Sequence, residues 1–207
     1  MDSFTIVGGK PLRGTVRVSG AKNVALKVVA AGLMTAEPLV LMNMPDLTDV
    51  RTMLEILEVF GSKTIFADHK VTIQTERIVT SQEPLELGAK CKTGTITFGP
   101  LLNMTGEAII PNPGGCRIGA RPIDRYIQGL EAMGAQITYK DGYFHAKASG
   151  GLKGTRFRFL KNSHTGTETL ILAGVLAKGT TIIENAAAEP EVDDLINLLN
   201  MMGAKIR

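Results

Sequence analysis

The chain repeats twice more the pattern of Val50-Arg51-Thr52-Met53-Leu54-Glu55-Ile56-Leu57-Glu58-Val59-Phe60-Gly61, and this repetition indicates the architecture. Residues 123–134 and 192–203 also begin with a β-branched residue and reach a glycine eleven positions later. Apolar residues recur in each copy at the spacing of one helix face, and the glycine stands where a helix ends. The pattern predicts three amphipathic helices in a repeating architecture.

The segments around these helices repeat as well. A short apolar strand ending in asparagine precedes each helix, at residues 39–43, 108–112 and 181–185. Upstream of each strand lies another helical stretch, at residues 21–35, about 95–104 and 167–177. Strand pairs follow in two copies, 63–67 with 70–75 and 136–139 with 143–148, the latter turned by Lys140-Asp141-Gly142. The third copy reaches Arg207 where its pair would begin, so we expect an incomplete third repeat.

The composition narrows the functional classes. Of the 207 residues, 44% are hydrophobic and only 5% aromatic, with no tryptophan, which predicts a globular protein with an aliphatic core. The net charge of +3 comes without a Lys/Arg block or an aromatic stacking platform, which argues against a nucleic-acid partner. No apolar run approaches the roughly 18 residues of a membrane span.

The sequence lacks the patterns of a signal peptide, a disulfide framework, a metal site and a nucleotide cofactor site. The start of the chain lacks the pattern of a signal peptide, so we expect a cytoplasmic protein. The two cysteines form no CxxC pair, which favours reduced thiols. The spacing of His, Cys and Asp predicts no metal site, and no Walker A or GxGxxG fingerprint indicates a nucleotide cofactor. We therefore expect neither metal nor cofactor.

One loop breaks the repeat. From strand-ending asparagine to helix start there are seven positions in copies one and three, but eleven in copy two. The longer loop reads Pro113-Gly114-Gly115-Cys116-Arg117-Ile118-Gly119-Ala120-Arg121-Pro122. Glycines let backbone N–H groups approach an anion, Arg121 suits phosphate, and nearby guanidinium groups favour a thiolate at Cys116. The alternative is a glycine-rich turn with an incidental cysteine.

Two other predicted helix starts are candidate ligand-binding sites. Lys22, in Ser19-Gly20-Ala21-Lys22-Asn23, opposes the helix dipole, for which a bound anion is one reason and a merely exposed lysine the alternative. The run from Lys161 to Thr167 is rich in hydroxyl and amide groups, although Ser163 or Thr165 could simply cap a helix. The pair of Cys116 and His164 could also indicate a cysteine hydrolase, but no further element of such a family is present.

Four segments together resemble the enolpyruvyl transferases, specifically the UDP-N-acetylglucosamine 1-carboxyvinyltransferase family; these are residues 14–23, 113–124, 129–135 and 179–187. The resemblance implies an α/β (α+β) fold, an inside-out α/β barrel in which three βαβαββ-type repeats surround buried helices. It implies that residues 1–207 form one domain, with repeats at about 15–80, 85–150 and 155–207, and that the family's second domain is absent.

The resemblance also implies an activity. The family transfers the enolpyruvyl group of phosphoenolpyruvate to the 3′-hydroxyl of UDP-N-acetylglucosamine, the first committed step of peptidoglycan precursor synthesis. Cys116 would be the proton donor and fosfomycin target, and Lys22 the second catalytic residue. The implied substrate contacts are Lys22, Asn23, Lys92, Arg121, Pro122, Ile123, Asp124, Arg125, Lys161, Asn162, Ser163 and His164. No cofactor is implied, and without the second domain the isolated chain would be inactive.

Three departures from the family pattern keep a second interpretation open. Lys92 stands where the family has arginine, His164 lies in a stretch that usually reads Ser-Val-Gly-Ala-Thr, and Ala188 replaces an arginine. The alternative is a non-catalytic sugar-nucleotide-binding module or a degenerate paralogue. An incomplete third repeat would leave an open sheet edge, so we also expect self-association.

Overall fold

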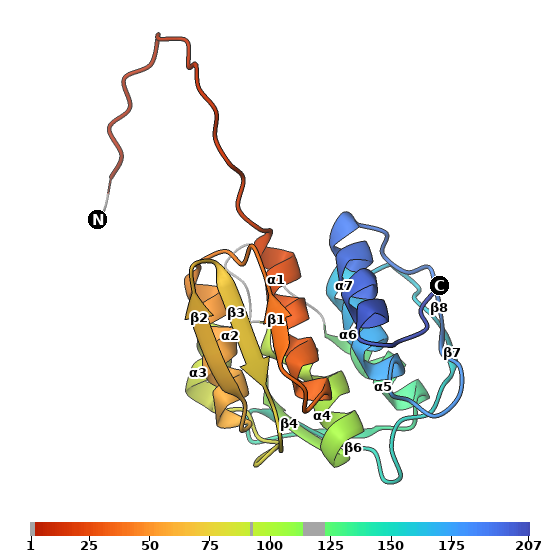
Figure 1. The fold of residues 1–207 in the computed structure, drawn as a ribbon. Coiled ribbons are helices and arrows are strands. Elements are labelled where there is room, and N and C mark those ends of the chain that lie inside the picture. The colour runs from red at the N-terminus through yellow and green to blue at the C-terminus, as the bar shows by residue number, and fades with distance from the viewer. Residues whose placement is uncertain (1–2, 92, 114–122) are drawn as a thin grey trace.

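The computed structural model describes residues 3–91, 93–113 and 123–207, which form three successive repeats behind an extended N-terminal arm (Figure 1). The first repeat contains α1 (Lys22–Ala30) and its 3-10 continuation η1 (Ala31–Met34), β1 (Leu39–Leu41), α2 (Thr48–Val59), β2 (Lys63–Ala67) and β3 (Lys70–Gln74). The second contains α3 (Leu85–Lys90), η2 (Gly94–Thr97), α4 (Phe98–Thr105), β4 (Glu107–Pro111), α5 (Asp124–Ala132), β5 (Gln136–Lys140) and β6 (Tyr143–Lys147). The third contains β7 (Arg156–Arg158), α6 (His164–Gly174), β8 (Ile182–Glu184) and α7 (Pro190–Met201).

The repeating signals in the sequence correspond to real helix ends. The glycines that follow α2, α5 and α7 have φ angles of +108°, +96° and +103°, at Gly61, Gly134 and Gly203. Glycine adopts this left-handed region without the steric cost of a Cβ, so each helix ends there. Asn43 and Asn185 are also left-handed, with φ of 56° and 52°, which explains why asparagine ends these strands. The three predicted helices are thus confirmed.

Three small sheets carry the strands. The first has the order β1-β3-β2 and the second β4-β6-β5, with antiparallel pairing throughout, and β7 pairs in parallel with β8. Both predicted hairpins are confirmed. The strand β7 and the helix α3 were not predicted from the sequence, because three residues alternating Arg-Phe-Arg and six helical residues are too short for a periodic signal. A parallel bridge from Gln82 to Ile109 repeats the β7–β8 arrangement in the second repeat.

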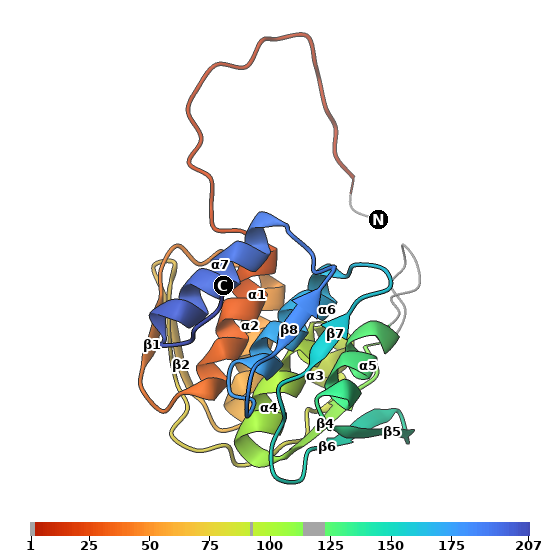
Figure 2. The ribbon, with the colours of Figure 1, turned by 90° about the vertical axis from the view of Figure 1, so that its right-hand side faces the viewer.

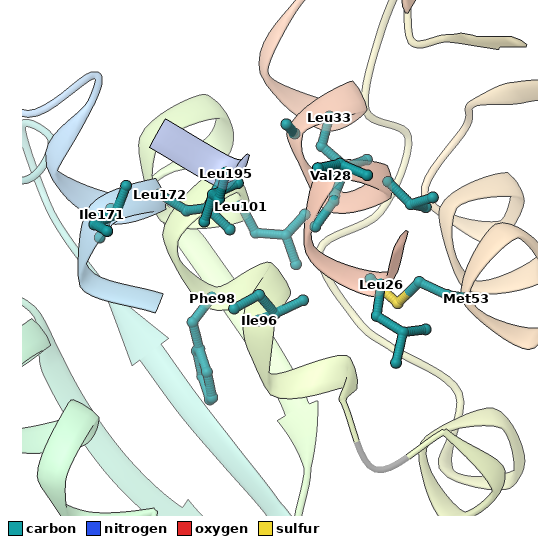
Figure 3. Packing of buried hydrophobic residues seen from close by; sticks show 14 of the residues in the cluster. Leu26, Val28, Leu33, Met53, Ile96, Phe98, Leu101, Ile171, Leu172 and Leu195 are labelled. Atoms are coloured by element: carbon teal, nitrogen blue, oxygen red, sulfur yellow. The ribbon is translucent and has the colours of Figure 1, made fainter. Parts of the chain in front are cut away.

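One helix of each repeat lies at the centre of the molecule. The helices α1, α4 and α6 lie between the sheets (Figures 1 and 2), and their facing side chains interdigitate in Figure 3. Leu33, Ile96, Phe98, Leu101 and Leu172 have no exposed surface. The core is largely aliphatic, and the expected arrangement of repeats around buried helices is confirmed.

The approach of α4 to α6 depends on one glycine. A Cβ atom on Gly99 would lie 2.6 Å from the backbone nitrogen and 2.9 Å from the Cα of Ala173. Those are backbone atoms, so they cannot rotate aside, and only glycine permits this separation of the two helices. Asn103 reinforces the contact by donating its Nδ2–H to the carbonyl of Ala173 at 2.9 Å.

The arm before α1 stands apart from the rest. Its described residues lie in no helix or strand, and both ribbon views show it projecting from the body (Figures 1 and 2). Its apolar side chains are almost fully exposed, for example Phe4, Leu12 and Val16 at 96%, 98% and 87%. Within the described ranges, no helix combines the length and apolarity needed to cross a bilayer.

Candidate functional site

Two polar contacts join the starts of helices that lie far apart in the sequence. Lys22, the first residue of α1, places its Nζ 2.8 Å from Oδ2 of Asp49 in the first turn of α2. Arg125, in the first turn of α5, donates from Nη1 to the carbonyl oxygen of Asn162 at 3.1 Å, just before α6. The helices α1 and α2 thus begin together, as do α5 and α6.

Glu191 joins these two pairs. Its carboxylate lies beside the Asn23 side chain of α1 and His164 of α6. Together with its own backbone N–H, the largest cause, these groups lower the pKa of Glu191. The starts of α1, α2, α5, α6 and α7 therefore gather at one end of the molecule, from which the arm also leaves (Figure 1).

We call this the helix-start cluster and define it by Lys22, Asn23, Arg125, Asn162 and His164. The N-terminus of a helix carries partial positive charge and free backbone N–H groups, both of which favour bound anions. Five such ends converge here with the basic side chains of Lys22 and Arg125. This end of the molecule therefore suits a phosphorylated ligand.

Lys22 has a partner that the sequence did not reveal. Its ammonium group is ion-paired with Asp49, so the described structure compensates its unfavourable position at a helix start with a carboxylate. The side chains of Lys22 and Asp49 are 51% and 43% exposed. Such a surface pair contributes little stability, and the ammonium group stays accessible to a ligand anion.

The start of α6 is held by a cap. The hydroxyl oxygen of Ser163 accepts the backbone N–H of Gly166 at 3.1 Å, which confirms Ser163 as the N-cap. The carbonyl of Asn162 is engaged by Arg125, whereas the side chain of Lys161 is exposed. The cap and the carbonyl contact therefore position this turn, and Lys161 is the accessible cation beside it.

Behind this turn lies a buried charge cluster. Lys27 Nζ is 3.1 Å from Oε2 of Glu168, and Nε2 of His164 is 3.3 Å from Oε1 of the same carboxylate. The side chains of Lys27 and Glu168 are 5% and 0% exposed. Only His164 was singled out from the sequence; a lysine inside the apolar run of residues 25–30 was the signal that could have found its neighbours.

Cys91 and Glu83 form a second buried polar region. The Cys91 thiol is 2% exposed, and burial, the main cause, raises its pKa to about 11. Cys91 therefore behaves as a small buried hydrophobe. Burial also raises the pKa of Glu83 to about 8, and its carboxyl oxygens have no hydrogen-bond partner among the described residues. A Cβ atom on Gly88 would lie 2.8 Å from Oε1 of Glu83 and one on Gly94 still closer, so these glycines make room for the carboxyl group.

The remaining predicted site residues fall into two groups, those outside the described residues and those within them. Lys92, Cys116, Arg121 and Pro122 lie outside the described residues. Ile123 immediately precedes α5 and is packed partly against the core, and Asp124 is exposed at the first position of that helix. Over residues 3–91, 93–113 and 123–207, no group of three or more His, Cys, Asp or Glu side chains could hold a metal ion.

Comparison with known proteins gives consistent matches. The family model described as EPSP synthase (3-phosphoshikimate 1-carboxyvinyltransferase) matches residues 6–207. The chain is 48% identical over 210 residues to the UDP-N-acetylglucosamine 1-carboxyvinyltransferase of Koribacter versatilis, covering 100% of this chain and 48% of the relative. It is 47% identical over 208 residues to the protein of the same name from Coxiella burnetii, again covering 100% and 48%. The chain thus spans about half the length of these relatives.

Solved structures agree on the fold. The enolpyruvyl transferase NikO from Streptomyces tendae superposes with a TM-score of 0.83 at 21% identity, covering 97% of this chain and 47% of that one. EPSP synthase from Acinetobacter baumannii gives a TM-score of 0.70 at 20% identity, covering 87% and 42%. At such identities the likeness shows the fold alone, and it matches the inside-out arrangement of repeats expected from the sequence.

Proposed function

Because this chain belongs to the EPSP synthase family, we propose that it forms one wall of an enolpyruvyl transferase site for phosphoenolpyruvate and UDP-N-acetylglucosamine. The observation that carries the proposal is the helix-start cluster. Five helix N-termini converge there with Lys22 and Arg125, in a chain of small positive net charge. Both substrates are phosphorylated, and such an end of a molecule favours anions.

The choice of sugar nucleotide rests on the relatives. Two proteins 47–48% identical to the whole chain carry the name UDP-N-acetylglucosamine 1-carboxyvinyltransferase, whereas the EPSP synthase structure is 20% identical. The loop that breaks the repeat, with Cys116, also belongs to the resemblance with the former group. We therefore assign the chain to peptidoglycan precursor synthesis. We also propose a cytoplasmic location. The two cysteines do not form the pattern of a disulfide framework, which is typical of proteins in a reducing compartment.

The proposed reaction is an addition followed by an elimination. Cys116 donates a proton to C3 of phosphoenolpyruvate while the sugar 3′-oxygen bonds to C2 and loses its own proton to a base. Loss of a C3 proton and cleavage of the C2–O bond to phosphate then form the enol ether and release inorganic phosphate. Cations stabilise the departing phosphate, which is the role we give Lys22 and Arg121. The substrate contacts we propose are the remaining residues named from the resemblance: Asn23, Lys92, Pro122, Ile123, Asp124, Arg125, Lys161, Asn162, Ser163 and His164.

A chimera tests this function. The chain is joined to the second half of the Koribacter versatilis relative, and phosphate release is measured with phosphoenolpyruvate and UDP-N-acetylglucosamine. We expect turnover with this acceptor but not with shikimate 3-phosphate. Cys116→Ala should abolish it, and Cys91→Ala is the matched control that should retain it. The chain without its added half should release no phosphate above the Cys116→Ala background.

The departures at Lys92, His164 and Ala188 favour a second candidate, a sugar-nucleotide-binding module without catalysis. A lysine keeps the positive charge of the family's arginine but loses its two-pronged grip on phosphate. A chimera that binds UDP-N-acetylglucosamine by calorimetry yet releases no phosphate would support this candidate and overturn the catalytic one. Restoring activity through Lys92→Arg would attribute the loss to that position.

A further inference from the structure

Glu83 is fully buried between the short helix α3 and the 3-10 helix η2. Both of its carboxyl oxygens lack a hydrogen-bond partner within the described ranges. A Cβ atom on Gly94 would lie 2.7 Å from Cδ of Glu83, and one on Gly88 would lie 2.8 Å from Oε1, so the two helices enclose the carboxyl group tightly. The fold tolerates this group while it is neutral, because a buried carboxylate without a partner is costly.

The surroundings of Glu83 differ in how firmly they are held. The backbone N–H of Glu83 donates to the carbonyl of Ile109 at 2.9 Å, and the N–H of Ile109 donates to the carbonyl of Ser81 at 2.8 Å. All four residues of η2 are buried, and η2 continues directly into α4 in the core. The carboxyl group can therefore reach water most easily if α3 moves.

The helix α3 is weakly anchored. It has six residues, no side-chain cap at Pro84, and Gly88 as its one buried residue. Leu87 packs only partly against the core, and Leu85 is 53% exposed. A single turn and a half of helix is unstable by itself, and a segment with so few buried apolar contacts opens at a lower free energy than the whole fold.

The charges near Glu83 do not stabilise an ionised carboxylate. Burial is the one cause that raises the pKa of Glu83. Burial, and then the charges of Glu83 and Asp49, raise the pKa of the Cys91 thiol, whereas Lys22 lowers it. A carboxylate at Glu83 would thus have a thiol, and behind it another carboxylate, as its neighbours.

The elements packed around the carboxyl group bring no buried cation to it. The titratable residues of α3 and β4 are Glu86, Lys90 and Glu107, none of which is buried, and η2 has none. Tyr126 of α5 reaches Thr95 of η2, and burial raises the pKa of this tyrosine to about 12, so it stays uncharged below pH 8. In the described part of the chain, ionised Glu83 would have to be stabilised by water.

We propose that α3 is a pH-controlled cover: ionisation of Glu83 releases residues 85–90 from the body of the protein and exposes the Cys91 thiol, while the rest of the fold persists. Cys91 follows α3 directly, and its N–H donates to the carbonyl of Leu87 at 2.8 Å, so unwinding of α3 frees it. The carboxyl pKa is about 8 in the closed form and returns to an ordinary 4.5 once α3 opens. Between these values opening releases a proton, so its equilibrium constant rises about tenfold per pH unit.

Amide hydrogen exchange of the intact chain, followed by mass spectrometry, is the first test. Protection is the observed exchange rate relative to that of an unstructured peptide at the same pH. For the amides of α3 it should fall about a hundredfold from pH 5.5 to pH 7.5 in the parent. It should stay constant in Glu83→Gln, and the exposed control Glu86→Gln should behave like the parent. A pH-independent protection of α3 in the parent would overturn the proposal.

Urea separates local opening from global unfolding. Local opening of α3 exposes little surface, so low concentrations of urea should hardly change its exchange, whereas exchange of the core helix α4 should accelerate. An equal response of α3 and α4 would mean that α3 opens only when the whole chain unfolds, which contradicts the proposal. This measurement uses the parent chain, so it decides the question even if Glu83→Gln does not fold.

Alkylation of Cys91 by iodoacetamide is the second test, performed in a Cys116→Ala background so that one thiol remains. The rate with Glu83 present is divided by the rate in Glu83→Gln at each pH, which cancels the titration of the exposed thiol. This ratio should rise about a hundredfold from pH 5.5 to pH 7.5. A constant ratio would show that ionisation of Glu83 does not expose Cys91.

Discussion

Glu83 is a buried residue whose ionisation should reduce stability. Its carboxyl group is buried without a hydrogen-bond partner among the described residues, and its pKa is raised to about 8 from an ordinary 4.5. Below pH 4.5 both folded and unfolded chains hold the proton. Between pH 4.5 and 8 only the folded chain keeps it, so stability falls as pH rises through this window and the loss is complete above pH 8.

We therefore predict that Glu83→Gln flattens the pH dependence of unfolding. Relative to the parent, the variant should gain on the order of 3 kcal/mol between pH 5 and pH 8. Urea unfolding at several pH values measures the difference, and Glu86→Gln, an exposed neighbour, provides the same substitution as a control. Parallel curves for parent and Glu83→Gln would mean that Glu83 is not the titrating group.

The two cysteines should differ sharply in reactivity. The thiolate is the reactive form, and Cys91 is both 2% exposed and raised in pKa to about 11. The sequence places Cys116 between glycines and near two arginines. Brief treatment with iodoacetamide followed by peptide mass mapping should find Cys116 labelled well before Cys91. Equal or faster labelling of Cys91 would contradict this order.

At the scale of elements, the contact of α4 with α6 should tolerate no added methyl group. In an ordinary helix, alanine for glycine stabilises by about 1 kcal/mol. At Gly99 the added Cβ would meet backbone atoms of Ala173 at 2.6 and 2.9 Å, so the helices must separate. We expect Gly99→Ala to be destabilising by about 1–3 kcal/mol despite its better helix propensity.

A matched glycine on the same helix pair checks this reasoning. A Cβ on Gly174, at the end of α6, would lie 3.2 Å or more from side-chain atoms of Thr181, which can shift slightly. Gly174→Ala should therefore change the free energy of unfolding little in thermal or urea denaturation. A stabilised Gly99→Ala would show that α4 and α6 have room to move apart.

At the scale of the whole molecule, we predict self-association through exposed strand-forming segments. Val16 and Val18 are 87% and 83% exposed, and alternate with polar residues as strand-forming segments do. Within the described residues β8 pairs only with β7, whereas β1 and β4 each pair with a hairpin strand. An alternating arm and an unpaired strand edge favour strand addition between copies.

Sedimentation over a wide range of concentration measures this association. The parent chain should increase in average mass with concentration, and Val16→Lys with Val18→Lys should reduce the effect without altering the body. Thr15→Lys places a charge on the opposite face of the same segment and should reduce the association less than the double variant does. A parent that stays monomeric at every concentration would exclude association through either segment.

The repeating architecture could be predicted from local features of the sequence. Helix periodicity and terminal glycines are local signals, and both occur in residues 50–61, 123–134 and 192–203. Each of these segments forms a helix followed by a left-handed glycine, as local backbone preferences predict. The same reasoning narrowed the helix cap to Ser163 or Thr165, and the structure has Ser163 in that position, since capping depends on immediate surroundings. Short elements such as β7 could not be predicted in this way, because its three residues form a strand only when β8 lies beside them.

Which polar groups meet depends on the tertiary structure. Asp49 is 27 residues from Lys22, and Glu168 is 141 residues from Lys27, so no spacing in the sequence could pair them. These contacts exist because the repeats wrap around a common core and bring the starts of separate helices to one end. Burial likewise decided the state of Glu83, since a carboxyl group changes its pKa when the fold removes it from water, and no feature of residues 82–84 specifies that.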